Sequence, residues 1–225
     1  MLDIKKNLLY RLLAERGREG VTIEEASKTA SLSEDIVKEF LEGKRGVAIE
    51  GGVIRLVDTA RFLLEAWLDG VDVINVALAA GWREFEDFVA VVLSEFGYEV
   101  RRNVTFKEGG RRHQIDVLAA SKPTLLVIDC KKWSRARTYH LKQAALAQAA
   151  RTEALLRAQP PELRSLTSGW ERGEVAPVIV SLLPGTVRIY EGIPIVPLRL
   201  FPPFLKELPA YSTEVLTYDI NLKNR

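Results

Sequence analysis

Two segments with the pattern of β-strands follow each other closely in the chain, 114–120 and 125–133. A hairpin that is symmetric about the short turn between them places Asp116 directly opposite Asp129. Side chains alternate between the two faces of a strand, so Lys131 shares a face with Asp129. A shift of one residue would put the two aspartates on opposite faces, so this register is a prediction in its own right.

Charged groups in so apolar a hairpin need partners, because burying a charge is costly unless it is paired or binds a metal ion. An ion pair between Lys131 and one aspartate, at a strand end, is one solution, but it leaves a carboxylate over. A divalent cation bound by Asp116 and Asp129 relieves their repulsion. Ligands that are all oxygen favour Mg²⁺ or Mn²⁺ over zinc. The single cysteine, Cys130, excludes a disulfide scaffold within the chain and a zinc site with several cysteines.

The formal net charge of +2 conceals an uneven distribution. Residues 101–142 hold eleven Lys and Arg against three acidic residues, a net charge of +8, whereas 1–57 are neutral and 58–100 are acidic. A basic block inside a nearly neutral protein is typical of a surface that binds phosphates, with a solvated loop as the alternative.

The composition is that of an ordinary globular protein, with 47% hydrophobic and 28% charged residues. No apolar stretch reaches the roughly 18 residues that a membrane span needs. The first residues, MLDIKKN, lack the pattern of a signal peptide. We therefore expect a cytoplasmic location and no membrane partner.

The first sixty residues have the pattern of three helices followed by a β-hairpin. Apolar residues keep helical spacing up to Leu13, Thr22 and Glu25 form a capping-box pattern, and Ser33 can cap a third helix. The segment VAIEGGVIRLV then contains two short β runs about a Gly-Gly turn. This order resembles a winged helix-turn-helix domain over about residues 3–57.

The third helix of such a domain usually reads DNA. Here it carries more acidic than basic residues, and the acidic ones are Glu34, Asp35, Glu39 and Glu42. Because these carboxylates repel phosphate, we favour a role in protein contact or dimerisation over direct reading of the major groove.

From residue 81 onward the pattern is that of an α/β domain. An amphipathic helix, WREFEDFVAVVLSEFG, precedes three strand-like segments and an Ala-rich helix at 138–158. Two strands follow at 175–183 and 187–190, and then a strand and a short helix within 193–208. We expect a winged helix-turn-helix domain, a connecting helical segment, an α/β domain and a C-terminal tail, at 1–57, 58–80, 81–208 and 209–225.

Three short motifs, together with the order of the helix and strands that carry them, resemble the PD-(D/E)xK nuclease superfamily. The resemblance is to its Mrr-type and RecB-like branches. Glu86 in WREFEDF matches the acid of the helix, Asp116 in HQIDV the central acid, and Asp129-Cys130-Lys131 the last motif. The resemblance covers about residues 81–200 and implies a restriction endonuclease-like α/β core with a central mixed sheet. The chain departs from the pattern in having Ile115 before the central acid and Asp rather than Glu in the last motif.

The resemblance implies a role for each matched residue. Asp116, Asp129 and the backbone carbonyl of Cys130 would hold Mg²⁺ or Mn²⁺ near the scissile phosphate. Lys131 would orient the attacking water or neutralise charge on the phosphate. Glu86 would bind the metal or its water shell, with its neighbours Glu84 and Asp87 as alternatives.

Nucleic-acid contacts are expected on the helix that follows the hairpin and at its entry. Members of the superfamily often place a Gln on this helix, and both Gln143 and Gln148 are candidates, as is Arg151. Ordinary exposed polar residues are the alternative here. The expected basic rim of the site consists of Lys132, Arg135, Arg137 and Lys142.

Together these features predict a Mg²⁺-dependent endodeoxyribonuclease of DNA repair, recombination or restriction, with DNA a better candidate substrate than RNA. The alternative is a non-catalytic DNA- or protein-binding factor, such as a winged-helix regulator, that uses the nuclease fold as a scaffold. Such factors normally lose the Asp or the Lys, and this chain has both. Enzymes that cut two strands commonly act as symmetric dimers, so a homodimer is expected, formed through 71–80 or the winged helix.

Overall fold

The computed structural model divides the chain into two compact units, 1–91 and 92–225, which we describe separately. It describes residues 2–72, 82–133, 137–182, 186, 188–208 and 214–221. Arg135, expected in the basic rim, and most of the 71–80 segment, expected in a dimer contact, lie outside these residues. In the part of the chain that the structure describes, no helix is both long and apolar enough to span a membrane.

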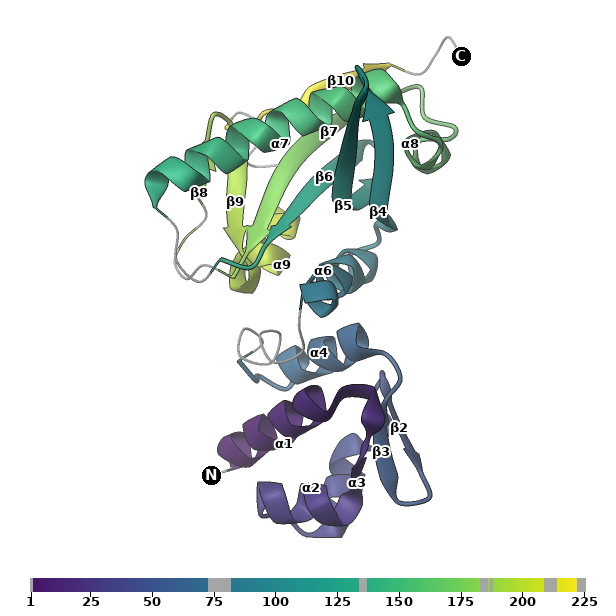
Figure 1. Cartoon of the computed structure of the whole chain (residues 1–225), viewed down its shortest axis with the longest axis vertical. Helices are drawn as coiled ribbons and strands as arrows, with labels where there is room; N and C mark the ends of the chain where they lie inside the picture. The colour runs from purple at the N-terminus through teal and green to yellow at the C-terminus, as the bar shows by residue number, and fades with distance from the viewer. Residues whose placement is uncertain are drawn as a thin grey trace. The chain divides into compact units, whose positions relative to one another are not determined.

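The first unit contains four helices and a small sheet in the described residues (Figure 1). The strands lie in the order β1-β3-β2. Thr22 and Ser33 cap α2 and α3 through their side-chain oxygens, as their positions in the sequence predict. The assignment of this unit as a winged helix-turn-helix domain stays a prediction. Its elements are α1 (Leu2–Arg16), a 3₁₀ turn (Gly17–Glu19), β1 (Val21–Thr22), α2 (Ile23–Ala30), α3 (Glu34–Leu41), β2 (Val47–Glu50), β3 (Val53–Leu56) and α4 (Thr59–Leu68).

Helix α6 (Trp82–Glu95) begins in the first unit and ends in the second. Its phenylalanines Phe85 and Phe88 are buried, and the ring of Phe88 lies 5.8 Å from that of Trp67 on α4. The amphipathic pattern of the segment therefore reflects packing of its apolar side. The predicted domain boundaries stay predictions.

The second unit is built on a seven-stranded mixed sheet in the order β4-β5-β6-β7-β9-β8, with β10 paired to β7. Helix α7 runs across one face of this sheet (Figure 1). The central mixed sheet and the helices confirm the expected α/β fold class. The elements are β4 (Glu99–Glu108), β5 (Arg111–Ser121), β6 (Thr124–Lys131), α7 (Thr138–Ala158), α8 (Pro161–Leu166), β7 (Arg172–Ser181), β8 (Arg188–Tyr190), β9 (Ile193–Pro197), a 3₁₀ turn (Leu198–Leu200), α9 (Phe201–Glu207) and β10 (Tyr218–Asn221).

The middle of the sheet is parallel and buried. Strand β7 runs parallel to both β6 and β9. The LLVI run of β6 and the VIV run of β7 are fully buried, which is why these segments are continuously apolar. On the face towards α7, Leu141 and Ala145 pack against Ile179, together with Ile193 and Ile195.

The predicted register of the β5–β6 hairpin is confirmed. Its pairs run from Ser121↔Thr124 at the turn to Val117↔Ile128. Both strands continue beyond this point, but no further pair between them is found in the described residues. The next residues along the two strands are Asp116 and Asp129, so the two aspartates lie where the hairpin opens.

Strand β10 lies in the segment that we expected as a C-terminal tail. Its four residues pair antiparallel with Arg172–Val175 of β7, while β9 pairs with the later residues Ile179–Ser181. Because β6 occupies the other side of β7, β9 and β10 share one edge of that strand.

Candidate active site

Strands β4 and β5 are irregular at Asp116. The residue opposite it is Asn103, which has a φ of 53°, in the left-handed region. Asn103 and Asp116 do not appear as a pair, although the register is the same on either side of them, at Arg102↔Val117 and Val104↔Ile115.

This irregularity interrupts the alternation of side chains. Ile115 and Leu118 would face opposite sides of a regular strand, yet both belong to one buried cluster with Ala154 and Leu155 of α7. The side chains of β5 therefore change the face to which they point between Ile115 and Leu118, the stretch that contains Asp116.

The carboxylate of Asp116 lies in the opening between β5 and β6. Its Oδ2 accepts a hydrogen bond from the backbone N–H of Cys130, at 2.8 Å. Burial raises the pKa of Asp116 above its ordinary value, and the charge of Asp129 raises it further, while the Cys130 N–H, Lys131 and Arg151 act in the opposite direction. The two carboxylates are therefore electrostatic neighbours, as the hairpin pattern predicts.

Asp129 is almost completely buried, with 2% of its surface exposed, and two cations neutralise it. Lys131 Nζ lies 3.0 Å from Oδ1 and 2.8 Å from Oδ2, and Arg151 Nη1 lies 2.6 Å from Oδ1. The contact with Oδ2 is an ion pair without hydrogen-bond geometry, so this buried oxygen accepts no hydrogen bond among the described residues. The Asp129–Lys131 ion pair of the alternative interpretation is thus present, and Asp116 is the carboxylate left over.

Helix α7 supplies two side chains that contact β6 at this cluster, those of Gln148 and Arg151. Its buried face includes Leu141, Ala145 and Gln148, spaced three or four residues apart. Gln148 is fully buried, and its Nε2 donates a hydrogen bond of 2.7 Å to the carbonyl oxygen of Val127, two residues before Asp129. Arg151, three residues further on, reaches Asp129 itself.

The other residues expected to bind nucleic acid that the structure describes lie in three places: at the start of α7, just after β6 and between α7 and β6. Arg137 and Lys142 are exposed at the start of α7, and Lys132 is half-buried just after β6. Gln148 is not accessible in this arrangement, because its side chain ties α7 to β6. The thiol of Cys130 is buried, and a role for its carbonyl oxygen as a metal ligand stays a prediction.

Glu86, the expected acid of the helix, belongs to the first unit, where its side chain is buried. Its neighbour Asp87 is half-buried. A contribution of Glu86 to the cluster around Asp129 stays a prediction.

Oxygen ligands for a hard divalent cation come from Asp116 and Asp129. Among the described residues, no group of three His, Cys, Asp or Glu side chains could hold a metal ion. One observation nevertheless fits a cation: the charge of Asp129 helps to raise the pKa of Asp116, so the neighbouring carboxylates repel each other. Such oxygens suit Mg²⁺ or Mn²⁺.

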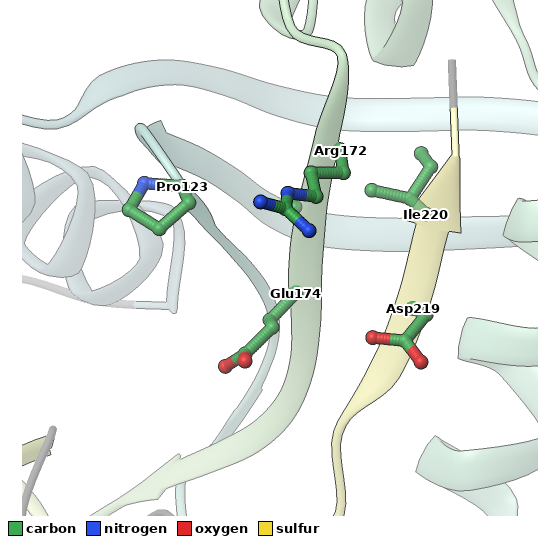
Figure 2. Close-up of a pocket in the computed structure, with 6 residues that line it drawn as sticks. Pro123, Arg172, Glu174, Asp219 and Ile220 are labelled. Atoms are coloured by element: carbon green, nitrogen blue, oxygen red, sulfur yellow. The ribbon is translucent and has the colours of Figure 1, made fainter. Parts of the chain in front are cut away.

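A hollow of about 510 Å³ lies elsewhere, at the opposite end of β6 and β7 (Figure 2). Arg172, Glu174 and Asp219 surround it, and Glu174 and Asp219 are direct partners across β7 and β10. Its described lining includes none of the predicted site residues. Glu174 pairs with Thr124, five residues before Asp129, so the hollow lies about 16 Å along β6 from Asp129.

Sequence reasoning missed Asn103, which has a φ of 53°. Asn tolerates the left-handed region better than most residues, but nothing in its local sequence distinguishes it from other polar residues of a strand. Ser181 was missed as well: it pairs with Lys131 across β6 and β7, and its buried hydroxyl has no partner among the described residues.

The mixed sheet with its helices, and the Asp–Lys–Arg cluster at the opening of a hairpin, define a protein with a restriction endonuclease-like α/β fold. Residues 81–180 match the nuclease-related domain, NERD. An uncharacterized protein of Archaeoglobus fulgidus is 30% identical over 133 residues, which cover 59% of this chain and 95% of that protein. The chain belongs to the nuclease-related domain family.

Two crystal structures are also similar to this chain. The protein of unknown function AF1548 has a TM-score of 0.30 and 20% identity, over 44% of this chain and 45% of that one. Protein VC1899 from Vibrio cholerae has a TM-score of 0.40 and 14% identity, over 95% of this chain and 52% of that one. The chain thus spans about half the length of each of these structures.

Proposed function

We propose that this protein is a metal-dependent endodeoxyribonuclease that hydrolyses phosphodiester bonds of DNA. The observation that carries the proposal is the meeting of Asp116, Asp129 and Lys131 where β5 and β6 part, inside a nuclease-related domain. Two carboxylates and a lysine in one partly buried cluster provide ligands for a cation and a charge for a phosphate.

Asp116 and Asp129 would hold Mg²⁺ or Mn²⁺, with the Cys130 carbonyl and Glu86 as further ligands. When bound, such a cation lowers the pKa of a water molecule and stabilises charge on the phosphate oxygens. The repulsion between the carboxylates supports this assignment.

The protein's own groups perform the remaining tasks. The backbone N–H of Cys130 fixes one oxygen of Asp116, which leaves the other free to act as a ligand. Lys131 is held by Asp129 with its ammonium 2.8–3.0 Å from the carboxylate and is partly exposed, so it can donate a hydrogen bond to a phosphate or to the attacking water. Arg151 forms an ion pair with Asp129 and compensates the charge of that buried carboxylate.

The DNA backbone would approach over the basic rim of Lys132, Arg135, Arg137 and Lys142. A surface rich in Lys and Arg beside a metal site suits phosphates better than a small substrate. We further propose that the first unit is a winged helix-turn-helix domain with a role in protein contact or dimerisation, and that the enzyme acts in DNA repair, recombination or restriction.

A cleavage assay tests the proposal. Labelled single-stranded, duplex and branched DNA, together with RNA, would be incubated with the protein in Mg²⁺, Mn²⁺ or EDTA. Asp129→Asn and Lys131→Ala would be compared with a control, Lys206→Ala, an exposed residue of α9. We expect cleavage of DNA only with the metal, a loss of about 100-fold or more in the two site variants and none in the control.

Cleavage that persists in EDTA or in both site variants would refute the assigned site. Binding of DNA without any cleavage would favour the alternative function, a non-catalytic binding factor on the same scaffold.

A further inference from the structure

A row of exposed polar residues extends from the irregularity at Asp116 towards the tip of the β4–β5 hairpin. We call it the hairpin row. It lies within the second unit and includes none of the residues that the sequence predicts to bind nucleic acid. Its members are Asn103, Thr105 and Lys107 on β4, and Arg112 and Gln114 on β5.

The register places these side chains on one face. Lys107 lies directly opposite Arg112, and Thr105 lies directly opposite Gln114, so the members of each pair point to the same side. Gln114 Nε2 donates a hydrogen bond of 3.2 Å to Asn103 Oδ1, which connects the row to the irregular pair at Asp116.

The other face of the same hairpin is apolar and covered. Val104, Phe106 and Ile115, which alternate with the residues of the row, belong to the buried cluster beneath α7 and α8. The hairpin row is therefore the solvent face of a strand pair whose other face is part of the core.

The positive charge of the hairpin row favours binding of an anionic partner. Like charges directly opposite each other on neighbouring strands are destabilising, yet Lys107 and Arg112 occupy such a pair. Neither forms an ion pair within the described residues, although the neighbouring Glu108 is paired with Arg157 on the covered face. The row has no carboxylate, and its neutral members can donate hydrogen bonds, as phosphate oxygens require.

The row reaches about 13 Å from Asp116, because Arg112 is four residues away along β5 at 3.3 Å per residue. It lies on the face of the hairpin turned away from α7, whereas Asp129 is held from the α7 side by Arg151.

We infer that the hairpin row binds the sugar-phosphate backbone of DNA beyond the candidate active site. This inference rests on the proposed function for DNA as the ligand, but the binding itself requires neither metal nor cleavage. The row would add a backbone contact on the face of the β4–β5 hairpin opposite α7.

The test is DNA binding in EDTA, with the full chain and a labelled duplex at several salt concentrations. The variant is Lys107→Gln/Arg112→Gln. The control is Lys206→Gln/Arg164→Gln, which removes one Lys and one Arg that are exposed on α9 and α8. We expect the hairpin variant to bind about tenfold or more weakly near 0.1 M salt, with a slope of log K against log salt that is smaller by about two. The control should match the wild type.

Unfolding by urea separates this effect from misfolding, because removing two opposed cations should leave the hairpin variant at least as stable as the wild type. Unchanged affinity and salt slope in the hairpin variant, or an equal loss in the control, would overturn the inference. If the variant loses binding but the wild type never cleaves, the hairpin row stands and the proposed nuclease activity fails.

Discussion

Removal of Arg151 is the sharpest test of how the site is held. Arg151 Nη1 lies 2.6 Å from Asp129 Oδ1, and the carboxylate is 2% exposed. In Arg151→Ala, Lys131 remains as the sole cation of the described residues in contact with Asp129. We expect the variant to be less stable without metal and to gain more from metal than the wild type does.

The magnitude follows from the burial of the two partners. Leaving a buried charge without any partner costs about 3–5 kcal/mol, whereas losing one hydrogen bond to a charged group costs about 1.5–3 kcal/mol. Lys131 still compensates Asp129, and the Arg151 side chain is 22% exposed, which weakens its interaction. We therefore expect a loss of about 1.5–2 kcal/mol in the free energy of unfolding, near the lower end of the hydrogen-bond range.

The assay is urea unfolding in EDTA and in excess Mg²⁺. A cation that binds only the folded state stabilises it in proportion to the logarithm of its concentration over its dissociation constant. If Asp129 binds the cation as proposed, Arg151 would compete with it, and Mg²⁺ should restore a larger part of the stability in Arg151→Ala than it adds to the wild type. Arg164→Ala, an exposed arginine of α8, is the control and should change neither value.

An Arg151→Ala protein that is as stable as the wild type in EDTA would show that the ion pair contributes nothing. An equal response of both proteins to Mg²⁺ would show that Arg151 and the cation do not share Asp129.

Three further predictions concern Asp116, Gln148 and Asn103. The pKa of Asp116 is raised, so the carboxyl group binds its proton more tightly in the folded protein than in the unfolded chain. The free energy of unfolding should therefore fall as the pH rises from the ordinary pKa of 3.8 through the raised pKa of the folded state. Asp116→Asn should remove this part of the pH profile and be at least as stable as the wild type near neutral pH, as urea unfolding across pH would show. Gln148→Met should lower the free energy of unfolding by about 1–3 kcal/mol, because the carbonyl of Val127 loses its donor, whereas Gln143→Met on the exposed side of α7 should not. Asn103→Ala should cost about 1–2 kcal/mol, since Ala is disfavoured at a φ of 53°, and Asn103→Gly should cost less; equal costs would exclude the left-handed conformation.

Much of the second unit is predictable because its signals are local. The predicted helix 138–158 has the bounds of α7, and the hairpin register follows from matching two apolar faces about a short turn. That register brings Asp116 and Asp129 together, as predicted from the sequence alone.

The parts that sequence reasoning missed depend on distant packing. The contact of Arg151 with Asp129 requires the placement of α7 over β6, which no local pattern specifies. The left-handed Asn103 is stabilised by the strands on both sides of it, because the register resumes at Val104↔Ile115. Strand β10 has only four residues, and its pairing with β7 depends on an edge formed far away in the sequence.

Strands β9 and β10 share one edge of β7, so the residues of β10 protect part of that edge. Strand β10 covers the backbone of Arg172–Val175, which β9 does not reach. Without residues 214–221, this half of β7 would present unpaired N–H and C=O groups next to a strongly apolar strand, which is a template for pairing with another chain. A chain that ends before residue 214 would still contain Asp116, Asp129 and Lys131. We therefore expect such a chain to associate with itself rather than to lose its candidate active site.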